Sequence, residues 1–160
     1  MKTVKQFLFA VLPVAIISLG SCTKTETTTT TEYSNLPVGA VTSLKTGTIS
    51  RQNAPATPPT SGTLSIIQDS KGKQFLKLNA DFTSGFATGT VAVYFAKTGD
   101  EIKNQRAGGT TPGNVLALGF VTKAGEQYIP LATSGSFSTF SFVVFYCETA
   151  EVNFGDAMIN

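Results

Sequence analysis

Two cysteines, Cys22 and Cys147, are the residues of this 160-residue chain whose side chains offer the widest chemistry. There is no histidine, which excludes Ser–His–Asp catalysis, histidine-ligated haem and most zinc and copper sites. No carboxylate pair has a spacing that indicates acid–base catalysis, and we expect Asp81 and Asp156 to accept backbone hydrogen bonds in turns at strand ends. We therefore expect no catalytic residue, no metal site and no cofactor in a protein that is not an enzyme.

Cys22 closes a segment with the layout of an export signal. Lys2 and Lys5 give it a positive start, and an apolar run follows over residues 7–20. As a helix rising 1.5 Å per residue this run would span about 21 Å, short of the roughly 30 Å hydrocarbon core of a bilayer. An ordinary secretory signal and a short membrane anchor are the alternatives to a lipoprotein signal.

The motif Leu19-Gly20-Ser21-Cys22 resembles the bacterial lipobox. The resemblance implies diacylglycerol on the Cys22 sulfur, cleavage before this residue and acylation of the new N-terminus. Several acyl chains anchor a protein stably, because each buried methylene contributes about 0.8 kcal/mol. We expect a lipid-anchored protein of the bacterial cell envelope whose partner is membrane lipid. Thr23 stands where an inner-membrane retention signal often has Asp, which favours the outer membrane.

A threonine-rich segment follows the lipidation site. Seven of the nine residues from 23 to 31 are Thr, and no apolar periodicity is present, so the segment cannot bury a core. We expect a signal peptide over 1–21, a tether over 22–42 and a folded domain over 43–160. Residues 37–41 either continue the tether or pack on the domain.

The charge of the chain argues against nucleic-acid binding. Of 12 basic residues, Lys2 and Lys5 lie in the export signal, which leaves 10 against 10 acidic residues in the processed chain. No run of Lys or Arg is present to neutralise a phosphate backbone.

From residue 43 the pattern predicts an all-β, single-domain antiparallel β-sandwich or barrel, because short apolar or alternating runs recur between Gly, Pro and Ser clusters. Residues 100–106 are the best helical candidate, but they are polar and we expect a loop, within a mobile connection over 99–114. The expected strands are 47–51, 63–68, 74–80, 90–96, 115–121, 127–130, 140–147 and 151–154.

Two of these strands have patterns that predict their environment. Val91, Val93 and Phe95 share one face, with Ala92 and Tyr94 opposite. The run 140–147 is apolar on both faces, which is typical of a central strand covered on both sides. The phenylalanines near the C-terminus are expected to pack in the core.

Several segments, in order, resemble the DM-thirteen family. Its closing signature is an apolar strand ending in an aromatic residue and Cys, followed by V-x-F-G-x-A. The matching segments are Val143-Val144-Phe145-Tyr146-Cys147 with Val152-Asn153-Phe154-Gly155-Asp156-Ala157, and upstream Gly47-Thr48-Ile49, Ser61-Gly62-Thr63-Leu64, Leu76-Lys77-Leu78, Asp81-Phe82, Val93-Tyr94-Phe95 and Gly125, Tyr128 and Pro130.

The resemblance covers about residues 43–160 and implies a β-rich extracellular domain with a proposed role in electron transfer. By resemblance Cys147 would carry that role, opposite an unidentified redox partner in the envelope. The chain departs from the family pattern at residues 83–86, in an insertion at residues 88–89, and at Tyr146, where Trp is common.

The residues around Cys147 in the sequence do not favour a redox role. A redox thiol is favoured by a nearby cation, a helix N-terminus or a C-x-x-C partner, and the sequence places none of these beside it. Lipidation of Cys22 would leave it as the single thiol of the processed chain, able to pair between molecules or to form a sulfenic acid. Three roles stay open: a packed core residue, a redox or intermolecular thiol, and a metal or cofactor ligand. If Cys147 is only packed in the core, the alternative to an accessory role in electron transfer is a structural or ligand-binding module at the cell surface.

Overall fold

The structure, a computed structural model, describes residues 36–50, 60–85, 90–107 and 113–160. The expected signal peptide, the lipidation site Cys22 and residues 23–35 of the expected tether lie outside the described residues. Among the described residues, no helix is long and apolar enough to cross a membrane.

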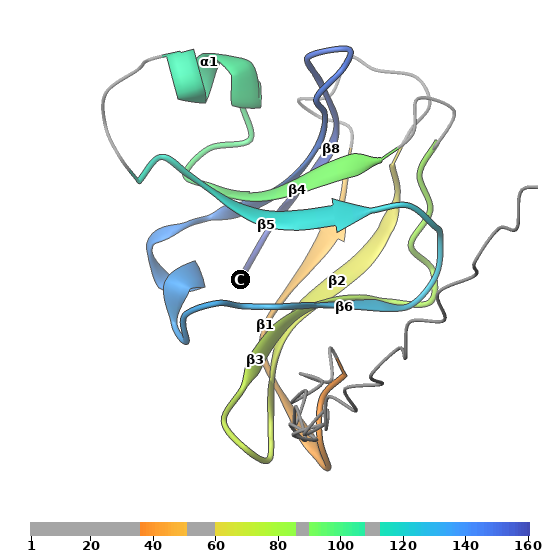
Figure 1. Cartoon of the computed structure of the whole chain (residues 1–160), viewed down its shortest axis with the longest axis vertical. Helices are drawn as coiled ribbons and strands as arrows, with labels where there is room; N and C mark the ends of the chain where they lie inside the picture. Colours follow the sequence, from red (N-terminus) through yellow and green to blue (C-terminus); the bar gives the residue numbers. More distant parts are fainter. Residues whose placement is uncertain (1–35, 51–59, 86–89, 108–112) are drawn as a thin grey trace, which may run out of the picture. The chain divides into compact units, whose positions relative to one another are not determined.

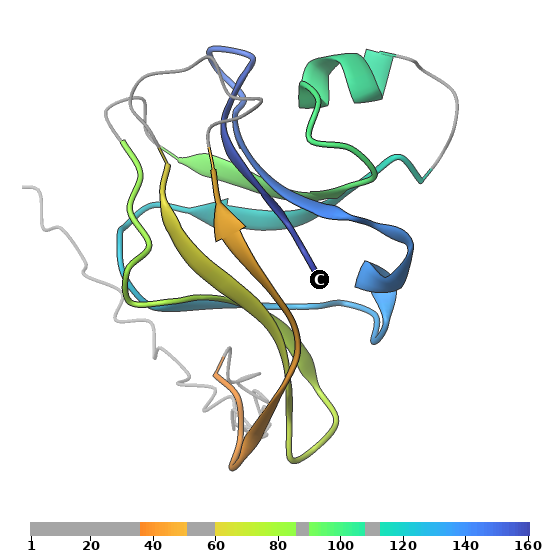
Figure 2. The same ribbon diagram turned by 180° about the vertical axis from the view of Figure 1, so that it is seen from behind.

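Eight strands form two antiparallel sheets of four strands each (Figure 1). One sheet has the order β1-β2-β3-β6 and the other β5-β4-β7-β8, and they face each other across the core as a β-sandwich (Figure 2). This confirms the all-β prediction. The strands are β1 (Val41–Ile49), β2 (Gly62–Asp69), β3 (Gln74–Leu78), β4 (Val91–Ala96), β5 (Val115–Val121), β6 (Gln127–Pro130), β7 (Phe142–Cys147) and β8 (Val152–Met158).

The two sheets are joined along one side of the sandwich. Ser50 and Asp156 exchange two backbone hydrogen bonds, 2.7 and 3.1 Å long, and Thr46 and Asn160 exchange two more at 3.0 Å. These pairs bring β1 of the first sheet beside β8 of the second. The molecule is therefore a sandwich whose β1–β8 side is partly closed, which places it between the two expected architectures.

Alternation along β4 and β7 builds a core on each side of the second sheet. Odd-numbered residues of both strands, among them Val93 and Phe145, face the first sheet and join the main core. Even-numbered residues, among them Tyr94 and Tyr146, form a smaller cluster on the outer face. β7 lies between β4 and β8, so the prediction of a central strand covered on both sides is confirmed.

A glycine permits the close approach of β2 to the β3–β4 connection. Gly62 begins β2 with a φ of 119°, a region that side chains with a Cβ rarely adopt. A Cβ here would lie 2.7 Å from the Cα of Phe82 and 2.8 Å from the carbonyl oxygen of Asp81. The carboxylate of Asp81 accepts hydrogen bonds from the backbone N–H and hydroxyl of Thr63. The expected backbone hydrogen bond is present, but it comes from β2 rather than from a turn of its own.

Three expectations differ from the structure. Residues 100–106, expected as loop, contribute to helix α1 (Ile102–Ala107), because Ile102 buries its side chain on the outer face of the second sheet. Asp156, expected at a strand end, lies buried inside β8, which continues to Met158. β1 begins at Val41, so the expected domain boundary at residue 43 falls inside a strand. The rest of the expected mobile connection, 108–112, lies outside the described residues.

Candidate functional site

Cys147 is the last residue of β7, and its side chain lies in the main core. The residue is 1% exposed and belongs to the same apolar cluster as Phe145 and Phe154. It is a thiol rather than half of a disulfide in the part of the chain that the structure describes. The backbone N–H of Ala150, in the turn that leads to β8, donates to its sulfur at 3.4 Å. In this state the thiol is shielded from macromolecular partners.

Glu148, which directly follows the cysteine, turns to the opposite side of the sheet. Its carboxylate accepts a hydrogen bond from the guanidinium of Arg106 at 2.7 Å and another from the hydroxyl of Tyr94. The sequence places this acid next to the thiol, but the pleat directs consecutive side chains to opposite faces. The charge of Glu148 therefore belongs to the outer face of the sheet.

Four side chains form a polar aromatic cluster on that outer face: Tyr94, Arg106, Tyr146 and Glu148. The guanidinium carbon of Arg106 lies 4.9 Å from the ring centre of Tyr94 and 5.0 Å from that of Tyr146. The two rings meet edge to face, with centroids 6.2 Å apart. A guanidinium nitrogen of Arg106 also donates to the phenol oxygen of Tyr94 at 2.6 Å. Arg106 thus joins both rings and the carboxylate.

Charges in this cluster are set by burial and by hydrogen bonds. Burial, followed by the hydrogen bond to Glu148, raises the pKa of Tyr94 to about 12. The hydrogen bond from Arg106 lowers the pKa of Glu148 below its ordinary value. At neutral pH the cluster therefore contains a protonated phenol that donates to an ionised carboxylate.

Residues 54–159 of the chain match the protein family described as Electron transfer DM13, which is about two thirds of the sequence. The chain belongs to the DM13 family. No curated protein and no solved structure matched it. The family description assigns an electron-transfer role to the matched region, which includes all seven strands from β2 to β8 and the residues of both sites described above.

The DM13 match confirms the resemblance drawn from the sequence motifs. The matched region contains both cysteine-bearing β7 and the V-x-F-G-x-A segment of β8. Residues 86–89, which include the insertion at residues 88–89, lie outside the described residues. Tyr146, which stands where Trp is common, is buried in the outer cluster and contacts Arg106.

Asn153 is a site residue of this DM13 domain that sequence reasoning did not single out. It is fully buried, and its amide nitrogen donates to the carbonyl oxygens of Gly99 and Asp100 while its amide oxygen accepts from the N–H of Ile102. These bonds fix the start of α1 on β8. In the sequence, Asn153 occupies the first variable position of V-x-F-G-x-A. That position gives no indication of a polar contact with a residue 51 positions away.

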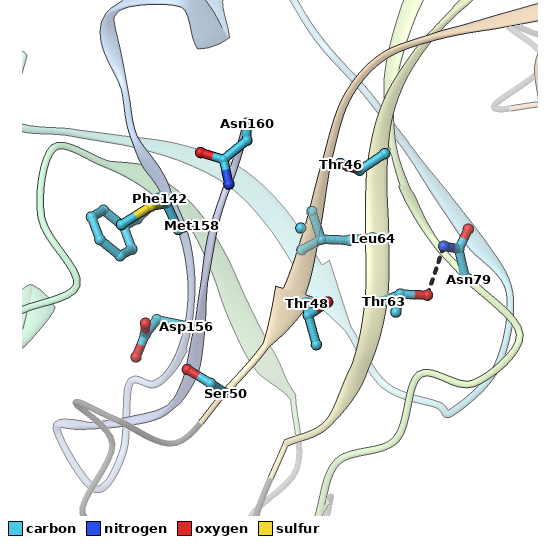
Figure 3. Close-up of a pocket in the computed structure, with 11 residues that line it drawn as sticks. Thr46, Thr48, Ser50, Thr63, Leu64, Asn79, Phe142, Asp156, Met158 and Asn160 are labelled. Carbon is cyan, nitrogen blue, oxygen red and sulfur yellow. Dashed lines mark hydrogen bonds between the residues drawn. The ribbon is translucent and has the colours of Figure 1, made fainter.

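A groove of about 760 Å³ runs along the joined β1–β8 side (Figure 3). Threonine hydroxyls of β1 and β2 line it, and Thr63 accepts a hydrogen bond of 2.9 Å from the amide of Asn79. The lining residues are Thr46, Gly47, Thr48, Ser50, Thr63, Leu64, Asn79, Phe142, Asp156, Met158 and Asn160. Cys147 does not line this groove, and none of the four residues of the polar aromatic cluster does.

Among the described residues, no three side chains of His, Cys, Asp or Glu gather closely enough to bind a metal ion together. Redox-capable groups in the described part of the DM13 domain include the shielded thiol of Cys147 in the main core and the phenol–carboxylate pair of Tyr94 and Glu148 on the outer face. A second phenol–carboxylate pair, Tyr128 and Glu126, lies on the first sheet.

Proposed function

We propose that this chain is a lipid-anchored, extracytoplasmic DM13 module that takes part in electron transfer and is not an enzyme. The DM13 match supports the electron-transfer role, and the lipobox-like motif ending at Cys22 supports anchoring in the bacterial envelope. Its partners would then be membrane lipid and a redox protein of the envelope. Of the two bacterial membranes, the outer one is favoured. Nucleic acid is excluded on charge.

The observation that carries the role of Cys147 is its 1% exposure in the main core. Thiol–disulfide exchange needs a thiolate to reach a sulfur of the partner, and a side chain enclosed by strands of both sheets cannot do so. We propose that this cysteine acts as a packed core residue in the folded domain, so that electron transfer does not proceed by thiol exchange in the closed state.

A redox role of Cys147 is the second candidate, and two observations favour it. Its sulfur accepts the N–H of Ala150, and the residue ends β7 beside the turn over residues 148–151. Glu151 in this turn has a φ of 54°, a strained value for a residue with a side chain. Opening of this turn alone would bring the thiol to the surface, where a peroxide could convert it to a sulfenic acid.

Thiol labelling of the full lipoprotein in detergent distinguishes the two roles. For a packed residue, a chromogenic disulfide reagent in excess reacts with Cys147 only as fast as the domain unfolds globally. Labelling in native buffer is then slow, and its rate increases with denaturant in parallel with unfolding followed by circular dichroism. Cys147→Ala gives the blank. Fast labelling without denaturant, or a rate that denaturant does not change, would overturn the packed role.

A further inference from the structure

The phenol of Tyr94 has the surroundings that one-electron oxidation of tyrosine requires. Losing an electron turns a phenol into a strong acid, so the proton needs an acceptor already in hydrogen-bond contact. The hydroxyl of Tyr94 donates to the carboxylate of Glu148, and Arg106 keeps that carboxylate ionised through a contact of 2.7 Å. Tyr94 lies on β4, Arg106 on α1 and Glu148 directly after β7, and the three side chains meet on the outer face of the second sheet.

We propose that Tyr94 is a one-electron redox site of this domain, with Glu148 as its proton acceptor. The oxidant is a high-potential one-electron acceptor of the envelope, such as a high-valent haem iron. The Tyr94 ring loses one electron to the oxidant, its O–H bond breaks, and the proton forms a new O–H bond on Glu148. The products are a neutral tyrosyl radical, a neutral carboxylic acid and the oxidant reduced by one electron. Re-reduction returns the electron and the proton. The proposal rests on the electron-transfer role of the domain.

Burial of the Tyr94 ring supports this assignment. The residue is 9% exposed, which restricts the collisions with water-borne reductants and other radicals that shorten the lifetime of a tyrosyl radical. The phenol is protonated at neutral pH, as a tyrosine of ordinary pKa also is, so oxidation must release the proton to a neighbour. The hydrogen bond to Glu148 supplies that route without a movement of either side chain.

The ring of Tyr146 extends the site. It lies edge to face with Tyr94 at 6.2 Å and beneath the same guanidinium of Arg106. An aromatic ring at this distance is a second position for the electron vacancy. Tyr146 precedes Cys147 along β7, so the radical site and the core thiol occupy opposite faces of the same strand.

The same chain contains a matched control. Tyr128 on β6 donates a hydrogen bond of 2.8 Å to Glu126, whose carboxylate pairs with Lys77 at 2.9 Å. The chemistry of this group is that of the Tyr94 cluster: a phenol, a carboxylate and a cation. Its setting differs at the ring, because Tyr128 is only partly buried on the first sheet whereas Tyr94 is 9% exposed. The two carboxylate side chains are similarly exposed, 46% for Glu126 and 40% for Glu148. Comparison of the two tyrosines separates the effect of burial from the effect of the hydrogen bond.

The test is flash oxidation of the full lipoprotein in detergent by photogenerated tris-bipyridyl ruthenium(III), with a cobalt(III) ammine as the sacrificial acceptor. Radicals are followed by transient absorbance and by electron paramagnetic resonance after rapid freezing. We expect a long-lived tyrosyl signal in the wild type and in Tyr128→Phe, and its loss in Tyr94→Phe. Tyr33 and Tyr146 are present in every variant and contribute a common background, so the expected loss in Tyr94→Phe is the loss of the signal above that background.

Glu148→Gln tests the proton acceptor independently, because it keeps the size of the side chain and removes its basicity. We expect the radical to form more slowly than in the wild type. The effect of deuterated solvent on the rate of radical formation should also differ from that in the wild type. A radical yield and lifetime in Tyr94→Phe equal to those of the wild type would overturn the proposal, and so would unchanged kinetics in Glu148→Gln. Circular dichroism verifies that each variant is folded.

The outcome for Tyr94 is separable from the outcome for Cys147. All radical measurements are repeated in the Cys147→Ala background, where thiol chemistry is absent. Loss of the tyrosyl signal in that background would show that the signal depends on the cysteine and would overturn the assignment to Tyr94. Failure of the Tyr94 proposal leaves the labelling result for Cys147, and the role drawn from it, unaffected.

Discussion

At the scale of single residues, Glu148 determines how charge is distributed around β7. Its carboxylate pairs with Arg106 and Tyr94 on the outer face, so the charge lies away from the sulfur of Cys147 in the core. Cys147 and Glu148 are adjacent in the sequence, but their side chains lie in different environments. An apolar shell surrounds the thiol, while the acid belongs to a cluster that contains a cation and two phenols.

The raised pKa of Tyr94 predicts a loss of stability at alkaline pH. This pKa is about 12 in the folded domain, against about 10 in an unfolded chain. Between these values the unfolded chain releases the proton while the folded domain retains it, so the free energy of unfolding decreases as pH rises from about 10 to about 12. Denaturant unfolding across this range measures it. Tyr94→Phe should lose stability less steeply than the wild type, and parallel curves would contradict the prediction.

Asn153 provides a second prediction at this scale. Asn153→Ala leaves the carbonyl oxygens of Gly99 and Asp100 and the N–H of Ile102 without the amide that binds them. We expect the free energy of unfolding to fall by about 3 kcal/mol, because buried polar groups lose their partners. Urea denaturation followed by circular dichroism measures the change. The matched control is Asn104→Ala at an exposed position, where the free energy of unfolding should change by at most about 0.5 kcal/mol. Similar losses in the two variants would refute the anchoring role of Asn153.

At the scale of elements, α1 is a helix of six residues that cannot be stable alone. Tertiary contacts, three of which involve buried or aromatic side chains, attach it to the second sheet. Ile102 is buried in the outer cluster, Asn153 binds the residues where the helix starts, and Arg106 lies against two tyrosine rings near its end. Tertiary contacts therefore make this polar segment helical.

Arg106→Ala should release the end of α1. The variant loses two cation–π contacts and the pair with Glu148, and we expect a loss of about 2 kcal/mol. Hydrogen exchange of the helix amides should speed up more than exchange in β3. Lys103→Ala, which removes an exposed pair with Glu151, is the control, with a change of at most about 0.5 kcal/mol. Unchanged exchange in Arg106→Ala would show that the helix does not depend on this contact.

At the scale of the whole molecule, the thiol of Cys147 and the Tyr94 cluster lie on opposite faces of one sheet. The β5-β4-β7-β8 sheet buries Cys147 toward the other sheet and presents the Tyr94 cluster on its outer side. The groove along β1 and β8 lies on the joined side of the sandwich. The same sheet thus positions both the shielded thiol and the phenol site.

Anchoring is a property of the whole chain, and Cys22 tests it. Cys22→Ser removes the sulfur that would carry the lipid, so the protein should move from the membrane fraction to the soluble extracytoplasmic fraction. Intact-mass analysis of wild-type protein extracted from membranes should give a chain that begins at residue 22 with added acyl mass. Ser21→Ala, which leaves the sulfur in place, should stay in the membrane fraction. A wild-type chain without acyl mass would refute the anchor.

The strand pattern was determined by local sequence. The alternation of Val91, Val93 and Phe95 with Ala92 and Tyr94 predicted both faces of β4, because a pleated strand directs successive side chains to opposite sides. Seven of the eight strands were predicted within four residues at each end, whereas the first was expected from residue 47 and begins at Val41. The DM13 motifs identified the family.

Only the tertiary structure decided the polar sites. Arg106, on a polar segment predicted to be loop, meets Tyr94 and Glu148, which lie 12 and 42 residues away along the chain. Asn153 binds a loop more than 50 residues away. Strand periodicity is a local property and is readable from neighbours, whereas these contacts depend on which strands pair and on where the chain returns. Burial of Asp156 has the same origin, since Ser50, directly after β1, pairs with it across the joined side of the sandwich.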